Sequence, residues 1–145
     1  MRTPSPFLMS QSITLYNKLP NDEIPVNGSY ENKFSRVILR SVRYAQCEGA
    51  VTASSHGAVS DSLRVIILPC QSVCGKGYCS PNQYEELHES CWTIQKGEDY
   101  IALGEYNDDK PSTNKEGTRN DFKVTSVDIR YNPDGTIHHF EVNAK

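Results

Sequence analysis

The sequence predicts a mainly β fold: a small antiparallel β-barrel or sandwich of about six strands, with one short helix and a long polar loop. Its length of 145 residues is that of one domain able to close a single hydrophobic core. Its apolar residues come in short segments with alternating or β-branched side chains, which is typical of strands. We therefore expect a flexible N-terminal arm at residues 1–11 and a single β domain at residues 12–145.

Three strands are predicted in the first half of the chain. Residues 12–17 alternate polar and apolar side chains, as a half-buried strand does. Residues 34–44 are rich in β-branched and aromatic side chains and predict one long strand with a kink or bulge. Residues 63–68 predict a third strand, which Pro69 ends because proline cannot donate to a ladder. The small polar residues of 48–60 favour a loop between the second and third strands.

Two hairpins are predicted in the second half. Residues 92–94 and 100–103 flank a turn at 96–99, so we expect them to pair. The chain ends with two strands, at 122–130 and 137–142, joined through a turn at residues 132–135.

One helix is predicted, over residues 81–89. Ser80 can cap its N-terminus, Pro81 suits the first helical position, and Gln83 can complete a capping box. The carboxylates of this segment, such as Glu85 and Glu89, are expected to face solvent.

The long polar loop is predicted at residues 107–121. No residue in it is expected to anchor it to a core, and a loop of this length in a compact domain is usually functional or disordered. We expect contacts from outside the subunit to order it, which makes it a candidate assembly loop. Its polar residues are Asn107, Asp108, Asp109, Lys110, Lys115, Glu116 and Arg119.

Composition argues against several classes of protein. The net charge is −3 and no Lys/Arg cluster is present, so a nucleic-acid-binding surface is not indicated. The longest apolar run, residues 65–68, is far too short to span a bilayer. The N-terminus has no apolar signal-peptide region, so we expect the chain to stay in the cytoplasm where it is made. Its five cysteines are then expected to be reduced thiols.

The cysteine-rich segment is the sharpest candidate for chemistry. Thiolate and imidazole ligands close together in sequence could hold a tetrahedral zinc ion. Their spacings are not those of paired zinc knuckles, so the more favoured interpretation is that no cofactor is bound and a structural zinc is the alternative. The candidate ligands are Cys70, Cys74, Cys79, His88 and Cys91.

Catalytic constellations are not evident. His138 and His139 are adjacent on a strand, so they are expected to face opposite sides of the sheet and to share no ligand. His56 has no nucleophile motif around it. The glycines at 75 and 77 are too close together for a phosphate-binding loop. The sequence therefore predicts a protein that is not an enzyme.

The order of the segments resembles that of an uncharacterised family of small proteins from the head and neck genes of tailed bacteriophages. More distantly it is similar to head-closure (stopper) and head-tail joining proteins. The chain departs from the pattern in its Cys70 to Cys91 segment, where relatives have a shorter polar link, and in an inserted Glu98. The matching segments are residues 12–17, 36–39, 42–44, 61–69, 92–97, 99–105, 124–128 and 139–145.

The resemblance implies a structural virion protein, a subunit of the connector ring in the neck between the portal complex and the tail. The implied partners are further copies of the chain in a ring, expected to be dodecameric, the portal or adaptor proteins, and the tail-terminator or tail proteins. Genomic DNA would pass through the ring without sequence-specific binding, and no membrane is involved. The ring would be assembled in the host cytoplasm and reside in the virion. The alternatives are a tail-terminator or tail-completion protein and a small zinc-binding interaction module; a small hydrolase ranks third.

Overall fold

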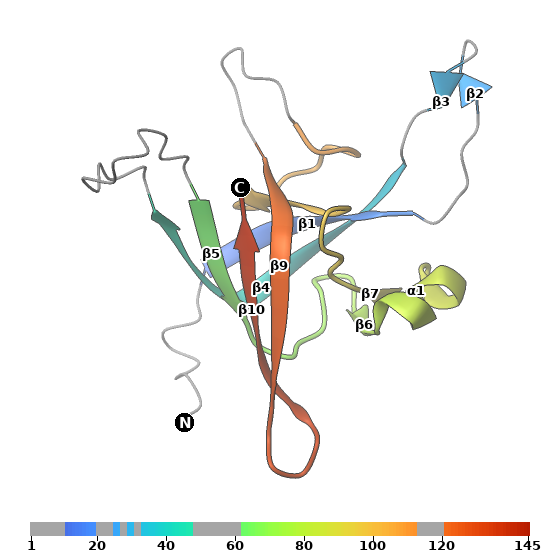
Figure 1. The fold of residues 1–145 in the computed structure, drawn as a ribbon. Coiled ribbons are helices and arrows are strands. Elements are labelled where there is room, and N and C mark those ends of the chain that lie inside the picture. Colours follow the sequence, from blue (N-terminus) through green and yellow to red (C-terminus); the bar gives the residue numbers. More distant parts are fainter. Residues whose placement is uncertain (1–10, 20–24, 27–28, 31–32, 48–61, 113–120) are drawn as a thin grey trace.

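Six antiparallel strands form a closed barrel in the computed structural model, which describes residues 11–19, 25–26, 29–30, 33–47, 62–112 and 121–145 (Figure 1). The predicted mainly β class is confirmed. Around the barrel the strands follow the order β1-β4-β5-β10-β9-β8. Their bounds are Gln11–Lys18 (β1), Phe34–Cys47 (β4), Ser62–Ile67 (β5), Tyr100–Leu103 (β8), Phe122–Tyr131 (β9) and Ile137–Ala144 (β10).

The long strand β4 bends, and it pairs with two different neighbours along its length. Its first half pairs with β1 and its second half with β5, and Val42 has a partner on each side. Between Leu39 and Val42 the strand takes three steps while β1 takes two, from Ile13 to Gln11. This extra residue is a β-bulge, which bends a strand and increases its twist. The predicted strand and its kink are therefore confirmed.

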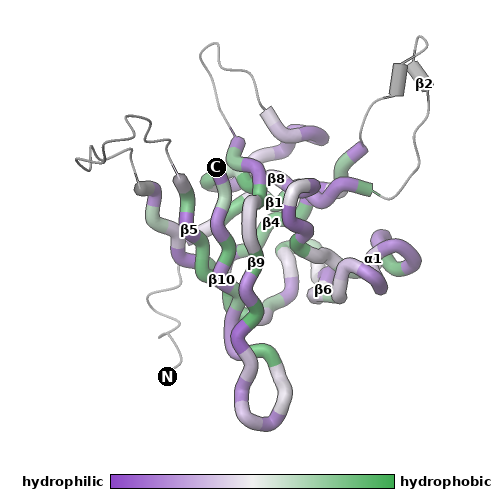
Figure 2. The backbone as a smooth tube through the Cα atoms, viewed as in Figure 1, coloured by the Kyte–Doolittle hydropathy of each residue, from purple (hydrophilic) through white to green (hydrophobic). Residues whose placement is uncertain are grey.

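The core lies inside the barrel. Along most strands every second residue points inward and contributes its side chain to this core. Figure 2 shows hydrophobic positions alternating with hydrophilic ones along the barrel strands. Strand β5 illustrates the pattern, because Leu63, Val65 and Ile67 are buried while Arg64 between them is exposed. The largest fully buried side chains of this core include Trp92, Phe140, Ile13, Leu15, Leu39 and Ile101. Tyr84 is buried in a second, small cluster with Cys79 and Cys91.

The chain leaves the barrel after β5 and returns at β8. This excursion, residues 68–99, contains β6 (Gly77–Tyr78), α1 (Pro81–Leu87) and β7 (Cys91–Trp92), and β6 pairs with β7 in parallel. Trp92 belongs to the barrel core, where its ring lies 5.2 Å from that of Tyr78 and 5.7 Å from that of Phe140. The excursion therefore contributes to the same core as the barrel strands.

The predicted helix is confirmed, with its end two residues earlier than expected. Ser80 Oγ accepts a hydrogen bond from the backbone N–H of Gln83, and Gln83 Oε1 accepts one from the backbone N–H of Ser80. Both halves of the capping box are present, and Pro81 is the first helical residue. The buried face of α1 is provided by Tyr84.

The predicted hairpin between residues 92–94 and 100–103 is wrong. Strand β8 pairs with β1 and β9, whereas Trp92 pairs with Tyr78 of β6. The turn between the two segments is held by the Asp99 carboxylate, which accepts a hydrogen bond from the backbone N–H of Gln95 at 2.7 Å. The two segments flank a turn, as predicted, but each finds its ladder partner elsewhere.

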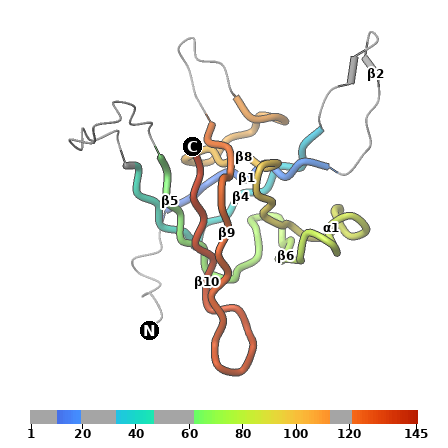
Figure 3. The backbone as a smooth tube through the Cα atoms, in the orientation of Figure 1, coloured from blue at the N-terminus to red at the C-terminus, as the bar shows by residue number. Residues whose placement is uncertain are grey.

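The last two strands form the predicted hairpin, which projects well beyond the barrel (Figures 1 and 3). In its turn, the backbone N–H of Asn132 donates to the carbonyl of Thr136 at 2.7 Å, and Asp134 Oδ1 accepts from Thr136. Gly135 has φ +91°, a value that favours glycine. A further short pair, β2 (Pro25–Val26) and β3 (Ser29–Tyr30), lies apart from the barrel.

No helix in the described segments is long and apolar enough to cross a membrane. The predicted loop at residues 48–60 and the N-terminal arm up to residue 10 lie outside the described residues. Gln11, the last residue of the expected arm, is part of β1, and its side-chain oxygen accepts a hydrogen bond from the backbone N–H of Tyr44 at 2.8 Å.

Candidate functional site

The base of the candidate assembly loop is anchored, contrary to the expectation that residues 107–121 contain no anchor. Asp121 is buried, and its Oδ2 accepts a hydrogen bond from the backbone N–H of Ser112 at 2.7 Å. The backbone N–H of Asp121 donates to the Ser112 carbonyl, also at 2.7 Å. A short acidic side chain can anchor a loop by hydrogen bonds alone, which an inspection for apolar residues does not detect.

The chain that leads into this loop is also fixed to the barrel. The backbone N–H of Tyr106 donates to Thr14 Oγ1 at 2.9 Å, and Arg36 Nη1 donates to the Tyr106 carbonyl at 2.9 Å. Arg40 and Glu105 form a two-point ion pair on the surface, and this hydrogen bonding from Arg40 lowers the pKa of Glu105 to about 2. The loop therefore starts from a fixed platform on β1 and β4.

Four of the candidate loop residues are exposed on this platform, and the other three lie beyond the described part of the chain. Asn107, Asp108, Asp109 and Lys110 are exposed. Lys115, Glu116 and Arg119 fall within residues 113–120, whose structure is not described. The loop is thus polar at its base.

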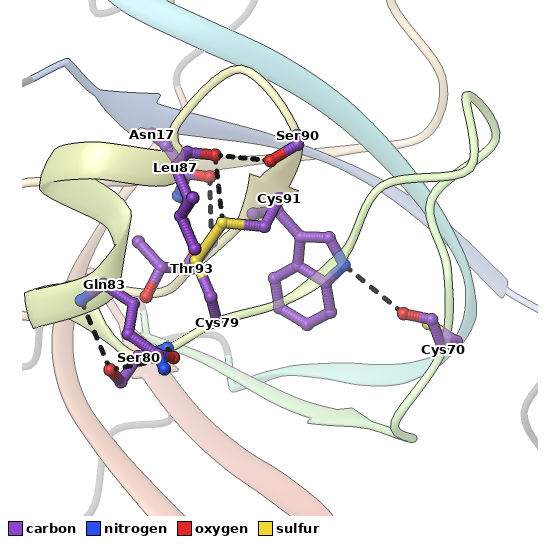
Figure 4. Close-up of a disulfide and its surroundings, with 10 residues drawn as sticks. Asn17, Cys70, Cys79, Ser80, Gln83, Leu87, Ser90, Cys91 and Thr93 are labelled. Carbon is purple, nitrogen blue, oxygen red and sulfur yellow. Dashed lines mark hydrogen bonds between the residues drawn. A yellow bond between two sulfur atoms is a disulfide. The ribbon is translucent and has the colours of Figure 1, made fainter.

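The candidate zinc ligands do not come together. Cys79 and Cys91 are joined by a disulfide across 12 residues of sequence, as Figure 4 shows. The expectation of reduced thiols is therefore wrong for this pair and holds for Cys70 and Cys74, which are free. The reason is geometric: α1 and its turn bring the two Cα atoms to 5.9 Å, within the range that a disulfide bridges. The side chain of Cys47 lies outside the described part.

No group of three or more metal-ligating side chains occurs within the described ranges. Cys70 is half-buried, and burial raises the pKa of its thiol. Cys74 is exposed, and His88 follows α1 as its C-cap. The carbonyl of Cys70 accepts a hydrogen bond from Trp92 Nε1 at 3.3 Å, so this part of the segment fixes the tryptophan (Figure 4).

A buried carboxylate, Asp99, joins the excursion to the barrel and was not identified from the sequence. Its Oδ1 accepts from the backbone N–H of Lys18 at 2.8 Å, and its Oδ2 accepts from Asn17 Nδ2 at 2.9 Å as well as from Gln95. Burial outweighs these three hydrogen bonds and raises the pKa of Asp99 to about 7. Asn17 also bonds both backbone groups of Thr93, so the pair of side chains fixes the return of the chain to β8.

The two histidines near the start of β10, close to the hairpin turn, lie together, which corrects the expectation that they face opposite sides of the sheet. Their Nδ1 atoms are 2.6 Å apart. From Ile137 to His139 strand β10 takes two steps while β9 takes one, from Tyr131 to Arg130. His138 is the extra residue of this bulge, and a bulge suspends the strict alternation of side chains.

An ionic network continues from these histidines along the outside of the barrel. His139 is buried, and its Nε2 lies 3.2 Å from Glu141 Oε1. Glu141 Oε2 accepts from Arg130 Nη2 at 3.3 Å, and Arg64 Nη2 is 3.9 Å from Glu141 Oε1. Hydrogen bonding from His139 and the charge of Arg130 lower the pKa of Glu141. The network spans β5, β10 and β9.

The geometry thus provides two polar features on a closed barrel: the loop base, where Ser112 and Asp121 bond to each other, and the projecting β9–β10 hairpin, which is fixed by its own turn and by the histidine network. Tyr131, the last residue of β9 before the hairpin turn, has 60% of its surface exposed. Exposed aromatic side chains on rigid supports suit protein contacts, because little conformational entropy is lost when they bind.

The model of a family described as a family of unknown function (DUF6751) matches residues 8–145. No curated protein and no solved structure has significant similarity to the chain.

Proposed function

The chain belongs to the DUF6751 family, and we propose that it is a structural subunit of the neck of a tailed bacteriophage. In this proposal it forms a head-closure (stopper) ring between the portal complex and the tail. The observation that carries the proposal is the closed six-stranded barrel with its projecting β9–β10 hairpin. The order of strand segments, which resembles that of small phage neck proteins, supports the same function.

A closed barrel suits a ring subunit because each of its six strands is paired on both sides. Open strand edges invite uncontrolled pairing with other chains, and closure removes them. Contacts between copies must then come from side chains and projecting connections. Such contacts can be heterologous, so that two different surfaces meet and repetition closes a ring.

The β9–β10 hairpin and the base of the loop at residues 112–121 differ in a way that fits two kinds of contact. The hairpin is fixed by its turn and its histidine network, so it can present Tyr131 to a neighbour without reorganisation. The loop from Ser112 to Asp121 is polar and anchored at its base. We propose that it reaches the axial channel or an adjoining ring, while DNA passes through the channel without base-specific contacts.

The test is complementation of a phage that lacks this gene. The wild-type chain, a variant with residues 113–120 replaced by a short Gly-Ser linker, and a matched variant with a Gly-Ser linker of the original length are supplied in turn. Ser112 and Asp121 are kept in both variants, so that the hydrogen bonds at the base of the loop remain.

Three outcomes separate the possible functions. DNA-packaged heads that fail to join finished tails, in the absence of the gene or with the short linker, support a neck protein. Tails of uncontrolled length indicate the alternative, a tail-terminator or tail-completion protein. Normal numbers of infectious particles without the gene overturn the proposal. The equal-length variant shows whether the sequence of the loop or only its length matters.

A further inference from the structure

We propose that His138 and His139 form a binding site for a divalent transition-metal ion that favours imidazole ligands and 90° ligand angles, such as Cu²⁺ or Ni²⁺, with water completing its coordination. This inference does not depend on the proposed function. It rests on three observations. The Nδ1 atoms of the two rings lie close together, the Glu141 carboxylate contacts the His139 ring, and a hollow lies beside His138.

The convergence comes from the bulge in β10. Because His138 is the extra residue, both rings reach the same side and their Nδ1 atoms lie 2.6 Å apart. The rings meet at 72° with centroids 4.8 Å apart, so their edges rather than their faces approach. Two ring nitrogens at this separation share one proton in the metal-free protein, with one ring donating and the other accepting.

Glu141 determines which of the two rings accepts the hydrogen bond between the Nδ1 atoms. Glu141 Oε1 lies 3.2 Å from His139 Nε2, so a hydrogen bond there requires the proton of a neutral His139 on Nε2. The lone pair of His139 is then on Nδ1, directed at His138. A metal-ligating histidine almost always donates its other ring N–H to such a carboxylate, which orients the ring and raises its basicity.

The separation of the two nitrogens can widen to accept a metal ion. Metal–nitrogen bonds of about 2.0–2.1 Å at a ligand angle of about 90° set the two nitrogens roughly 2.9 Å apart, a few tenths of an ångström more than observed. A tetrahedral angle requires roughly 3.4 Å, which favours ions with 90° angles. His138 is half-buried and lines a hollow of about 500 Å³ with Tyr131 and Asn132, and metal binding requires its ring to turn so that both nitrogens point at the ion.

The charges around the pair limit the affinity. Arg130 and Arg64 both approach Glu141, and they oppose a cation that the Glu141 carboxylate attracts. No third His, Cys, Asp or Glu joins the pair to form a larger ligand group within the described ranges. We therefore expect binding in about the micromolar range, tightest for Cu²⁺ among first-row divalent ions. When the metal binds, a neutral His138 carries its proton on Nε2.

The test is titration of the untagged chain with Ni²⁺ in a calorimeter. The variants are His138→Gln and His139→Gln, and His88→Gln, at the C-cap of α1, is the matched control. We expect one ion per chain in the wild type and in H88Q, and a loss of affinity of about tenfold or more in each of the other two. E141Q is expected to weaken binding less, by several-fold, since Glu141 does not touch the ion.

Electron paramagnetic resonance with Cu²⁺ then identifies the ligands. It uses a chain in which Cys47, Cys70 and Cys74 are serine, so that no free thiol reduces the copper. Coupling to two nitrogens that is lost in H138Q and H139Q supports the site, and circular dichroism confirms that each variant is folded. Equal Ni²⁺ binding in all variants, or none at about 100 µM metal, overturns the proposal and leaves a hydrogen-bonded histidine pair only.

Discussion

The β9–β10 hairpin and the excursion between β5 and β8 are both connections of the same barrel, but they are stabilised in different ways. The hairpin turn is held by residues within four positions of one another, such as Asn132 and Thr136. The excursion is held by contacts between residues far apart in sequence. Asp99 accepts a hydrogen bond from Asn17, 82 positions away, and Trp92 packs against Phe140.

This difference separates local from global stability. A turn that is held by hydrogen bonds among its own residues can be disrupted without opening the barrel. A connection whose side chains pack in the core cannot be disrupted in this way, because those side chains fill the space between the strands. Substitutions in the excursion should therefore destabilise the whole domain, and substitutions at the hairpin tip should have small effects.

The largest expected effect is that of Trp92→Ala. Trp92 is fully buried and belongs to the barrel core, so its removal should lower the free energy of unfolding by about 3–5 kcal/mol. Tyr131→Ala, at the exposed end of β9, is the matched aromatic control and should change the free energy of unfolding by about 0.5 kcal/mol or less. Urea denaturation measures both. Similar losses of unfolding free energy in the two variants would show that the excursion and the hairpin do not differ in their contribution to global stability.

The second effect concerns the disulfide of the excursion. Replacing both Cys79 and Cys91 by alanine should lower the free energy of unfolding by about 3 kcal/mol, because the crosslink restricts a loop of this length in the unfolded chain. Cys74→Ala, at an exposed free thiol, should be near neutral. Thermal denaturation of the two variants is the measurement. If the double variant melts with the wild type, the disulfide is not formed in the isolated protein.

Asp99→Asn should have a smaller effect that depends on pH. At about pH 4 the amide cannot reproduce the hydrogen bonds of the carboxyl, and we expect a loss of about 1–2 kcal/mol. The pKa of Asp99 is raised to about 7 in the folded protein, so the native state holds a proton that the unfolded chain releases near pH 4. Wild-type stability from this group is full below pH 4 and declines as pH rises through 7.

The variant lacks this titration, so the difference in unfolding free energy between Asp99→Asn and wild type should shrink from pH 4 to pH 8. Chemical denaturation at several pH values measures it. A difference that grows with pH would mean that the Asp99 carboxylate is stabilised by its three donors more than it is penalised by burial.

Gly135→Ala tests the hairpin turn itself. Gly135 has φ +91°, and alanine there should cost about 1 kcal/mol. The loss should be confined to the tip, where hydrogen exchange of the Thr136 amide should become faster while amides in β1 and β4 keep their protection. Faster exchange throughout the barrel would show that the turn and the core unfold together.

The smallest effect is expected for the loop between Ser112 and Asp121. Replacing residues 113–120 by a short Gly-Ser linker should leave the melting temperature nearly unchanged, since closure entropy depends weakly on length and the anchoring hydrogen bonds remain. A second variant, Asp121→Ala, should be less stable by about 1–2 kcal/mol because it leaves the Ser112 amide without its acceptor. The reverse order of stabilities would show that the loop, not its anchor, contributes to the core.

The sequence predicted those parts of the fold that local residues determine. Ser80 and Gln83 cap α1 through neighbours three positions apart, and the turn at residues 132–135 closes through its own side chains. The strands followed from alternation, which reflects burial on one face of a sheet. The prediction of a half-buried first strand is wrong, because β1 is buried on both faces from Ile13 to Asn17. These signals are contained within a few consecutive residues, so they can be identified without knowledge of the fold.

The features that sequence reasoning missed depend on contacts between distant segments or on one extra residue. The pairing of Trp92 with Tyr78 rather than with residues 100–103 depends on a core that no local pattern specifies. The Cys79–Cys91 disulfide follows from the path of α1, and the meeting of His138 with His139 follows from a bulge. For the buried Asp99 carboxylate, the sequence offered one signal, the position of this Asp directly after the turn residues Lys96, Gly97 and Glu98.

Cryo-electron microscopy of the mature particle tests directly whether the chain is a ring subunit of the phage neck. We expect a ring of six-stranded barrels between the portal complex and the tail, with the β9–β10 hairpin or the loop at residues 112–121 in contact with a neighbouring subunit or ring. A particle whose neck density contains no such barrel, or in which the chain lies elsewhere or is missing, would contradict it.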